Sequence, residues 1–245
     1  MKIITVSAAL LISCVGAFAP DNKNNSPRGT VAVSETLADL KVLAKELNPI
    51  VKFYDPLKLS ELEFWGQNEE ASIGWLRHAE IKHGRVAMAA FVGYVIQSSY
   101  VFTWAQNTAG DLPPSVDLLP EEQWDAIPNI AKWQIVGVVG FLEFWDEVGG
   151  MNTPHYMRGR KPGQYPSLDF FRNEVHWVPD LYDPFGFNKN RSQEKKDRGL
   201  LAEINNGRLA MLGIFGFLVA DKIPGSIPLL EGIAKPYAGE PMIPW

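Results

Sequence analysis

"EIKHGRVAMAAFVGY", residues 80–94, and "EINNGRLAMLGIFGF", residues 203–217, are two copies of one pattern. Each copy starts with a carboxylate, reaches an arginine five residues later and continues as an apolar stretch. The tripeptide Tyr-Asp-Pro precedes both copies, at 54–56 and at 182–184. Because a loop and a helix recur together, the sequence predicts two equivalent helices related by a pseudo-twofold axis.

The charged residues of the two copies have no good partner within their own copy. Glu80 and Arg85 are five residues apart, which places them about 140° apart around a helix. Between two crossing helices they fit well, Glu80 with Arg208 and Glu203 with Arg85. The glycine before each arginine lets the two backbones come close. The repeat therefore predicts two reciprocal ion pairs that hold the helices together.

Three long segments have the apolar content of helices, and few strand-like alternations separate them. They span residues 72–102, 129–147 and 193–220. At about 1.5 Å per residue the outer two reach about 40 Å, longer than the roughly 30 Å core of a bilayer. The sequence predicts an all-α membrane protein with three transmembrane helices, the first and third crossing as a pseudo-twofold pair. Short amphipathic helices are expected in the loops and at the C-terminus.

The loop charges indicate how these helices are oriented. The loop at 103–128 contains no Lys or Arg, whereas the loop at 148–198 contains nine. Basic residues concentrate on the side from which a membrane protein is inserted. We therefore expect the N-terminus on the basic side and the C-terminus on the opposite side. A soluble bundle with an uneven surface stays an alternative, because the mean hydropathy is −0.08.

Length, charge and cysteine content narrow the classes of protein. A chain of 245 residues favours one domain with appendages. The net charge of −5 lacks the basic excess of a nucleic-acid-binding protein. Cys14 is the one cysteine, so anything that begins after it has no disulfide, iron–sulfur cluster or thiol nucleophile.

Each copy also carries a neutral donor three residues after its carboxylate, on the same helix face. In the first copy it is His83, and in the second it is Asn206. A magnesium ion held by four macrocycle nitrogens needs one further axial ligand, and it accepts oxygen donors and imidazole. Single donors spaced along helix faces suit such a ligand better than a protein cage does.

The motifs Glu-x-x-His-x-Arg and Glu-x-x-Asn-x-Arg resemble the outer helices of the chlorophyll-binding light-harvesting antenna family, over roughly residues 50–235. The resemblance implies chlorophyll ligands on all three helices, with the two arginines as counter-ions. Glu143 matches the ligand of the middle helix, with an interfacial carboxylate as the alternative, and Gln134 is a weaker match. The implied magnesium ligands are Glu80, His83, Glu143, Glu203 and Asn206, with Gln134 as a further chlorophyll contact and Arg85 and Arg208 as counter-ions.

The loops "YDPLKL" and "YDPFGF" resemble the carotenoid-binding loops of the same family. The resemblance implies that their backbone and aspartate hold the head groups of two carotenoids in the helix-crossing grooves. A methionine on each outer helix would line a groove, although methionine at helical spacing is also typical of plain core. The implied carotenoid residues are Asp55, Pro56, Asp183, Pro184, Met88 and Met211.

Two further segments indicate which branch of the antenna family the chain resembles most. "PHYMRGRKPGQYPS" at 154–167 and "KPYAGEPMIPW" at 235–245 are similar to chlorophyll a/c antenna proteins of red-lineage algae. This implies chlorophyll c and an oxygenated carotenoid, or xanthophyll, beside chlorophyll a, with bound lipid as a further ligand. The chain departs from the family at Ala220, where many members carry a Gln or His ligand. The histidines at 78, 155 and 176 are expected at the surface rather than on a metal.

The N-terminus has the pattern of a targeting leader. Residues 1–17 are predicted to be a signal peptide, and residues 18–34 resemble the transit-like half of an algal plastid leader. An ordinary secretory signal with a flexible mature start is the alternative. Residues 35–245 would then form a single three-helix pigment-binding domain.

The resemblance implies a light-harvesting antenna subunit, not an enzyme, that passes excitation energy to a photosystem. Its expected partners are the photosystem core, neighbouring antenna subunits and thylakoid lipids, with no nucleic acid. It would lie in the plastid thylakoid membrane, with its N-terminus stromal and its C-terminus lumenal. Two alternatives are a photoprotective, energy-quenching member of the superfamily and a membrane metalloenzyme using Glu80 and His83.

Overall fold

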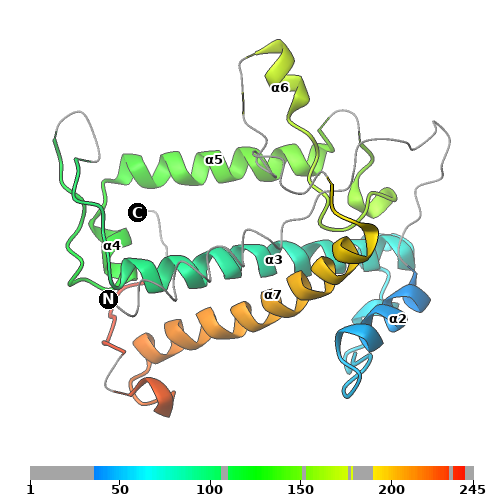
Figure 1. The fold of residues 1–245 in the computed structure, drawn as a ribbon, viewed down its shortest axis with the longest axis horizontal. Helices are drawn as coiled ribbons and strands as arrows, with labels where there is room; N and C mark the ends of the chain where they lie inside the picture. The colour runs from blue at the N-terminus through cyan, green and yellow to red at the C-terminus, as the bar shows by residue number, and fades with distance from the viewer. Residues whose placement is uncertain are drawn as a thin grey trace. The chain divides into compact units, whose positions relative to one another are not determined.

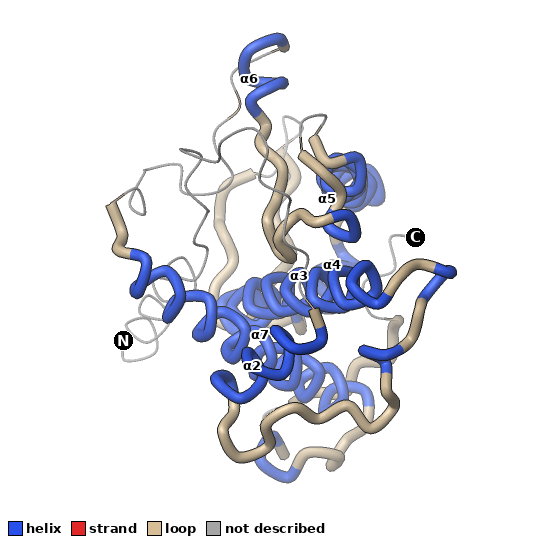
Figure 2. Tube along the Cα trace, turned by 90° about the vertical axis from the view of Figure 1, so that its right-hand side faces the viewer, coloured by secondary structure: helices blue, strands red, loops and turns tan. Residues whose placement is uncertain are grey.

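The computed structural model describes residues 36–105, 110–150, 153–175, 178, 190–231 and 234–240. Its described part contains helices and loops and no strand, as Figure 2 shows. The α-helices are α2 (Leu37–Leu47), α3 (Glu69–Gln97), α4 (Pro120–Ala126), α5 (Asn129–Val148), α6 (Asp169–Glu174) and α7 (Gln193–Lys222). The prediction of an all-α chain with three long helices is confirmed. The predicted leader segments at 1–17 and 18–34 lie outside the described residues.

The helix α3 ends at Gln97 rather than at the predicted Phe102. Two serines follow, and the Ser98 hydroxyl donates to the Tyr94 carbonyl at 2.7 Å. Serine side chains that bond to a nearby carbonyl compete with helical backbone bonds, which favours an end to the helix here. The apolar run that continues to Phe102 gave no sign of this stop.

The short elements lie before, between and after the long helices. The loops contain α2, α4 and α6, and 3-10 turns lie at Leu59–Glu61, Phe64–Gly66, Tyr156–Arg158 and Pro228–Leu230. Among the described helices, none combines the length and the apolar character that a membrane span requires. The membrane-spanning part of the expectation therefore stays a prediction.

The chain forms two compact units, and each contains part of α3, α5 and α7. Of the described residues, those within 36–85 and 142–207 form the motif unit, and those within 86–141 and 208–240 form the aromatic unit. Within each unit α3 and α7 lie side by side (Figure 1). In the motif unit the buried apolar side chains come from α3, α5 and α7 and from the loop after α5, and include Ile73, Ile81, Trp145, Leu168 and Ile204.

The aromatic unit is held by stacked rings and by a buried polar cluster. Phe217 on α7 stacks on Phe91 at 5.3 Å and on Tyr94 at 4.8 Å between ring centroids, both on α3. The Tyr94 hydroxyl donates to Asp221, and the Asp221 carbonyl accepts from the Tyr237 N–H at 2.9 Å. These contacts attach the C-terminal segment to the end of α7.

One buried carboxyl of this unit lacks a hydrogen bond. Glu121 on α4 is buried, and neither of its carboxyl oxygens has a hydrogen-bond partner. Burial raises the pKa of this carboxyl, and the neighbouring Asp221 carboxylate raises it further. The protonated form is therefore more favoured in the folded state than in the unfolded chain. Its contribution to stability is complete below the ordinary carboxyl pKa and is lost as the pH rises through the raised folded value.

We expect Glu121→Gln to stabilise the protein at neutral pH, by about 1–3 kcal/mol, because it removes a buried charge without a donor. The gain should shrink as the pH falls toward 4. Thermal unfolding of the purified protein across pH 4–8 measures it. Glu122→Gln is the matched control, since the Glu122 carboxylate already accepts from the Leu119 N–H at 2.9 Å. A gain independent of pH would contradict the assignment.

Candidate functional site

The two sequence copies meet where α3 and α7 approach most closely in the motif unit. A Cβ added to Gly207 would lie 2.9 Å from the Gly84 Cα, so only glycine fits this contact. One residue later, Arg85 Nε donates to Glu203 Oε1 at 2.6 Å. Glu203 is 5% exposed, and the pair is neutral. This is one of the two ion pairs between the helices that the repeat predicted.

A loop residue fixes the orientation of this arginine. Arg85 Nη1 donates to the Gly163 carbonyl at 2.5 Å, so two acceptors hold the guanidinium. Gly163 has φ +78°, and a Cβ there would lie 2.7 Å from Ile81 Cγ2. Both the left-handed backbone and the close approach to α3 require glycine.

The second predicted pair is not established in the same way. Glu80 accepts a hydrogen bond from Arg77 on its own helix. Arg208 belongs to the aromatic unit. The pairing of Glu80 with Arg208 therefore stays a prediction, and the arginine at 77 is a partner that the repeat did not indicate.

The neutral donors of both copies are exposed. His83 Nδ1 lies 2.7 Å from the Ala79 carbonyl, so this nitrogen carries the proton. The lone pair of Nε2 is then available, the state in which a histidine binds a metal. Asn206 on α7 is also exposed, and none of the described residues is its hydrogen-bond partner. Each helix thus presents one unused donor beside the crossing.

The middle helix contributes an exposed carboxylate with a partner on α3. Glu143 is 56% exposed in its side chain, and its Oε2 accepts from Lys82 Nζ at 2.6 Å. The same ammonium lies 2.7 Å from Asp146 Oδ2, one turn further along α5. Lys82 therefore spans two carboxylates of the neighbouring helix.

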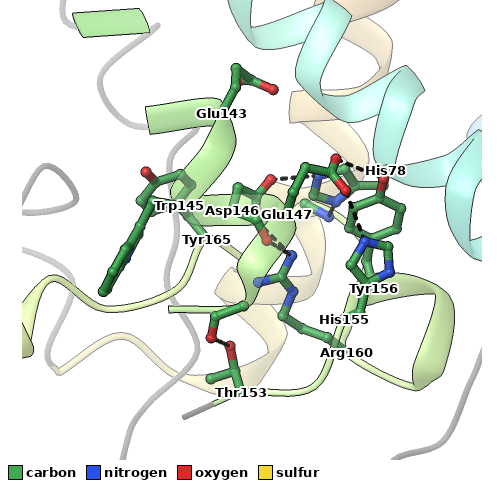
Figure 3. A network of polar contacts seen from close by, with 12 residues as sticks. His78, Glu143, Trp145, Asp146, Glu147, Thr153, His155, Tyr156, Arg160 and Tyr165 are labelled. Carbon is green, nitrogen blue, oxygen red and sulfur yellow. Dashed lines mark hydrogen bonds and ion pairs between the residues drawn. The ribbon is translucent and has the colours of Figure 1, made fainter. Parts of the chain in front are cut away.

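Asp146 is the centre of a buried polar network (Figure 3). It is 0% exposed, accepts from Arg160 Nη2 at 2.6 Å and lies 2.8 Å from His78 Nε2. His78 Nδ1 accepts from the Gly163 N–H at 3.1 Å, so the proton of the neutral ring is on Nε2. With both nitrogens engaged, His78 has no lone pair for a metal. The expectation that it lies at the surface is wrong, because Asp146 and the loop at 160–165 cover it.

Sequence reasoning did not identify this network. Its residues lie on α3, on α5 and in the loop after α5, and Tyr165 adds a hydrogen bond to the Leu142 carbonyl at 2.8 Å. Burial raises the pKa of Tyr165 to about 12, so its hydroxyl stays a donor. One signal was available. The segment "EFWDE" places three acids on an apolar helix without a basic residue beside them, which demands cations from elsewhere.

The predicted carotenoid residues have different environments. The Asp55 carboxylate accepts from the backbone N–H of Leu59 and of Ser60, at 3.0 and 2.9 Å, and from the Ser60 hydroxyl. These bonds lower its pKa, the Ser60 hydroxyl most, and hold the loop that contains Pro56. The role of this loop in carotenoid binding stays a prediction. Asp183 and Pro184 lie outside the described residues.

The remaining predicted residues lie on the long helices. Met88 is buried and Met211 is partly buried, as either a groove or plain core would require. Gln134 on α5 is exposed, and the described residues give it no hydrogen bond. Ala220 is buried at the end of α7, where it offers no donor.

The donor set fits pigment magnesium better than a protein-enclosed metal. The described residues contain no group of three or more His, Cys, Asp and Glu side chains able to hold an ion. They present single donors, of which His83, Glu143 and Asn206 are exposed and Glu203 is buried beside Arg85. Large apolar side chains are also exposed, on α5 at Val138, Val139 and Phe144 and on α7 at Leu209, Leu212 and Phe215. Flat apolar macrocycles and lipid would cover such surfaces.

Comparison with known families gives the same class of protein. Residues 40–222 match the family described as chlorophyll A-B binding protein. The chain belongs to this family. It is therefore a light-harvesting, pigment-binding protein that binds chlorophyll and carotenoid, and it is not an enzyme.

Individual relatives cover most of the chain. It is 29% identical over 230 residues to a fucoxanthin-chlorophyll a-c binding protein of Trieres chinensis, covering 91% of this chain and 96% of that protein. It is 28% identical over 226 residues to fucoxanthin-chlorophyll a-c binding protein C of Phaeodactylum tricornutum, covering 91% and 98%. Photosystem I chlorophyll a/b-binding protein 3-1 of Arabidopsis thaliana is 28% identical over 202 residues, covering 75% and 68%.

Proposed function

We propose that this chain is a thylakoid antenna subunit whose crossing helices hold chlorophylls beside a neutral ion pair and pass excitation energy to a photosystem. Bound chlorophylls absorb light and exchange excitation at rates that depend on their separation and orientation. The chain's own contribution is to fix those positions and to exclude water. The observation that carries the proposal is the pair of unused donors, His83 and Asn206, on either side of the Arg85–Glu203 contact.

The Arg85–Glu203 ion pair, which we call the clasp, explains how a carboxylate can serve as a ligand in an apolar setting. An isolated charge in a membrane helix costs about 2.5–3.5 kcal/mol at mid-helix. Arg85 Nε neutralises Glu203 through one oxygen, at 2.6 Å, and leaves the second oxygen for a metal. We assign the same role to Glu80 with Arg208, and to Glu143 on the middle helix.

We place α3, α5 and α7 across the membrane, with residues 35–245 as one domain. The charges that lower the hydropathy of α3 and α7 fall largely in the motif unit, where ion pairs such as Arg85–Glu203 neutralise them. The loop at 103–128 lacks basic residues and the loop at 148–198 has nine, which favours a stromal N-terminus and a lumenal C-terminus. A leader at 1–34 would deliver the chain to the plastid.

We further propose chlorophyll a and chlorophyll c, with a fucoxanthin-type carotenoid in the helix-crossing grooves and lipid at the exposed apolar faces. Support comes from the relatives in Trieres and Phaeodactylum, which are named as fucoxanthin-chlorophyll a-c binding proteins. The Arabidopsis relative is named for photosystem I. We propose a photosystem core and neighbouring antenna subunits as the partners.

Replacing the exposed histidine tests the ligand assignment. His83→Leu should remove about one chlorophyll per chain, because Leu has no lone pair, while the remaining pigments still assemble. Pigment extraction from the purified holoprotein measures the stoichiometry. His155→Leu is the control, since its ring nitrogens are occupied by Glu147 at 2.9 Å and by the Met157 N–H at 3.2 Å. Unchanged chlorophyll content in His83→Leu would refute the role of this residue.

No specific observation favours the energy-quenching alternative over light harvesting. The fluorescence lifetime of the purified holoprotein separates the two. A long lifetime, close to that of chlorophyll in an unquenched antenna, supports harvesting, and a strongly shortened lifetime supports quenching.

A further inference from the structure

The C-terminal part of α5 has an excess of negative charge that its own helix does not balance. Glu143, Asp146 and Glu147 lie within five consecutive residues, and the last turn of α5 contains no basic residue. Asp146 is 0% exposed, so it must be paired. Neutralisation therefore has to come from other elements.

Two cations from different elements share this task. Arg160, from the loop after α5, donates to Asp146 Oδ1 at 2.6 Å. Lys82, from α3, lies 2.7 Å from Asp146 Oδ2 and 2.6 Å from Glu143 Oε2. Because Asp146 also has Arg160 and His78, Lys82 is not its only partner. Among the described residues, Lys82 is the one cation that contacts Glu143.

The two carboxylate oxygens of Glu143 have different surroundings. Figure 3 shows Glu143 set apart from the Asp146 network along α5. Lys82 Nζ binds one carboxylate oxygen of Glu143 and is itself only 22% exposed in its side chain. Asp146 Oδ2 also binds this ammonium, at 2.7 Å, so the position of Lys82 does not depend on Glu143 alone. The other oxygen of Glu143 points to no described partner.

We propose that Lys82 is the counter-ion and positioning residue of a magnesium-tetrapyrrole site at Glu143, so that this pigment site is built by α3 and α5 together. The inference rests on the proposed function, since it takes Glu143 as an axial ligand. A carboxylate ligand adds a negative charge to a neutral pigment ring in an apolar setting. Lys82 cancels this charge and holds one oxygen, which leaves the other for the metal.

The competing role for Lys82 is purely structural, through its contact with Asp146. A charge-compensation test separates the two. Lys82→Met removes the ammonium and keeps the length of the stem. Glu143→Gln keeps an oxygen donor for magnesium and removes the charge that Lys82 balances. If Lys82 acts as the counter-ion, the amide ligand no longer needs it.

The experiment compares four variants of the full-length chain: Lys82→Met, Glu143→Leu, Glu143→Gln and the double substitution Lys82→Met/Glu143→Gln. Each variant is assembled with a pigment extract that contains chlorophylls a and c. Chlorophylls per chain are counted, and difference absorption spectra identify the missing band. We expect Lys82→Met to lose the same one chlorophyll, with the same band, as Glu143→Leu. Glu143→Gln and the double variant should both retain it. Lys195→Met, at an exposed position in the first turn of α7, is the control and should retain every pigment.

Each of four results would overturn the proposal. A full pigment complement in Lys82→Met would show that no counter-ion is needed. Loss of the pigment in the double variant as well as in Lys82→Met would show a structural role through Asp146. A full complement in Glu143→Leu, with one chlorophyll lost in His83→Leu, would refute this site and leave the proposed antenna function standing. A full complement in both leucine variants would refute the proposed ligand assignments together.

Discussion

Arg85→Leu is expected to abolish assembly of the pigment-loaded protein. The substitution leaves Glu203, which is 5% exposed, without its cation, and it also removes the donor to the Gly163 carbonyl. Removing one partner of a buried ion pair costs about 3–5 kcal/mol. Because the net stability of a domain is about 5–15 kcal/mol, this loss is large enough to prevent stable assembly. The yield of green holoprotein after purification measures the effect.

A second substitution distinguishes charge burial from loss of contact. Arg85→Leu/Glu203→Leu removes both charges, so it should recover much of the yield while lacking the chlorophyll at Glu203. Arg198→Leu is the control, since its contact with Glu194 at 3.0 Å is highly exposed and contributes about 0.3–0.5 kcal/mol. Normal assembly of Arg85→Leu with full pigment would contradict the clasp.

Gly207→Leu is expected to force the two outer helices apart. Its Cβ would lie 2.9 Å from the Gly84 Cα, and that atom belongs to the backbone, so no side-chain rotation relieves the clash. Overpacking of a close contact costs about 1–3 kcal/mol, and a backbone contact lies at the upper end. The melting temperature should fall, and the visible circular dichroism from pigments beside the crossing should change in shape.

The same helix provides a matched control for this substitution. A Cβ at Gly199 would have nothing within 4 Å, so Gly199→Leu should be neutral or slightly stabilising. An unchanged melting temperature and dichroism spectrum in Gly207→Leu would show that the helices do not need to approach closely.

The clasp could be predicted because the motif that forms it occurs twice in the sequence. Two copies of Glu, Gly and Arg at one spacing leave crossing as the simplest way to pair the charges, and the Arg85–Glu203 contact bears this out. The limits of α5 and α7 also followed from apolar content, since both helices stop near the predicted ends. Repetition and periodicity are properties of the amino-acid sequence itself, so they can be recognised before the structure is known.

The Asp146 network could not be predicted in the same way. Its contacts join residues 68 apart for His78 with Asp146 and 61 apart for Lys82 with Glu143. Contacts between residues so far apart in the sequence produce no periodic pattern that could predict them. The sequence around His78 is that of an ordinary surface residue, because it does not show that the loop at 160–165 covers this side chain. The unbalanced acids of α5 showed that cations were needed, but not which ones.

The structure of the native holoprotein, with its pigments, tests the central claim most directly. We expect a tetrapyrrole magnesium within about 2.0–2.1 Å of His83 Nε2, and others at the Asn206 amide oxygen and at the second oxygen of Glu203. It also predicts Arg208 in contact with Glu80. A holoprotein in which these donors face lipid or water, and its chlorophylls are held elsewhere, would contradict it.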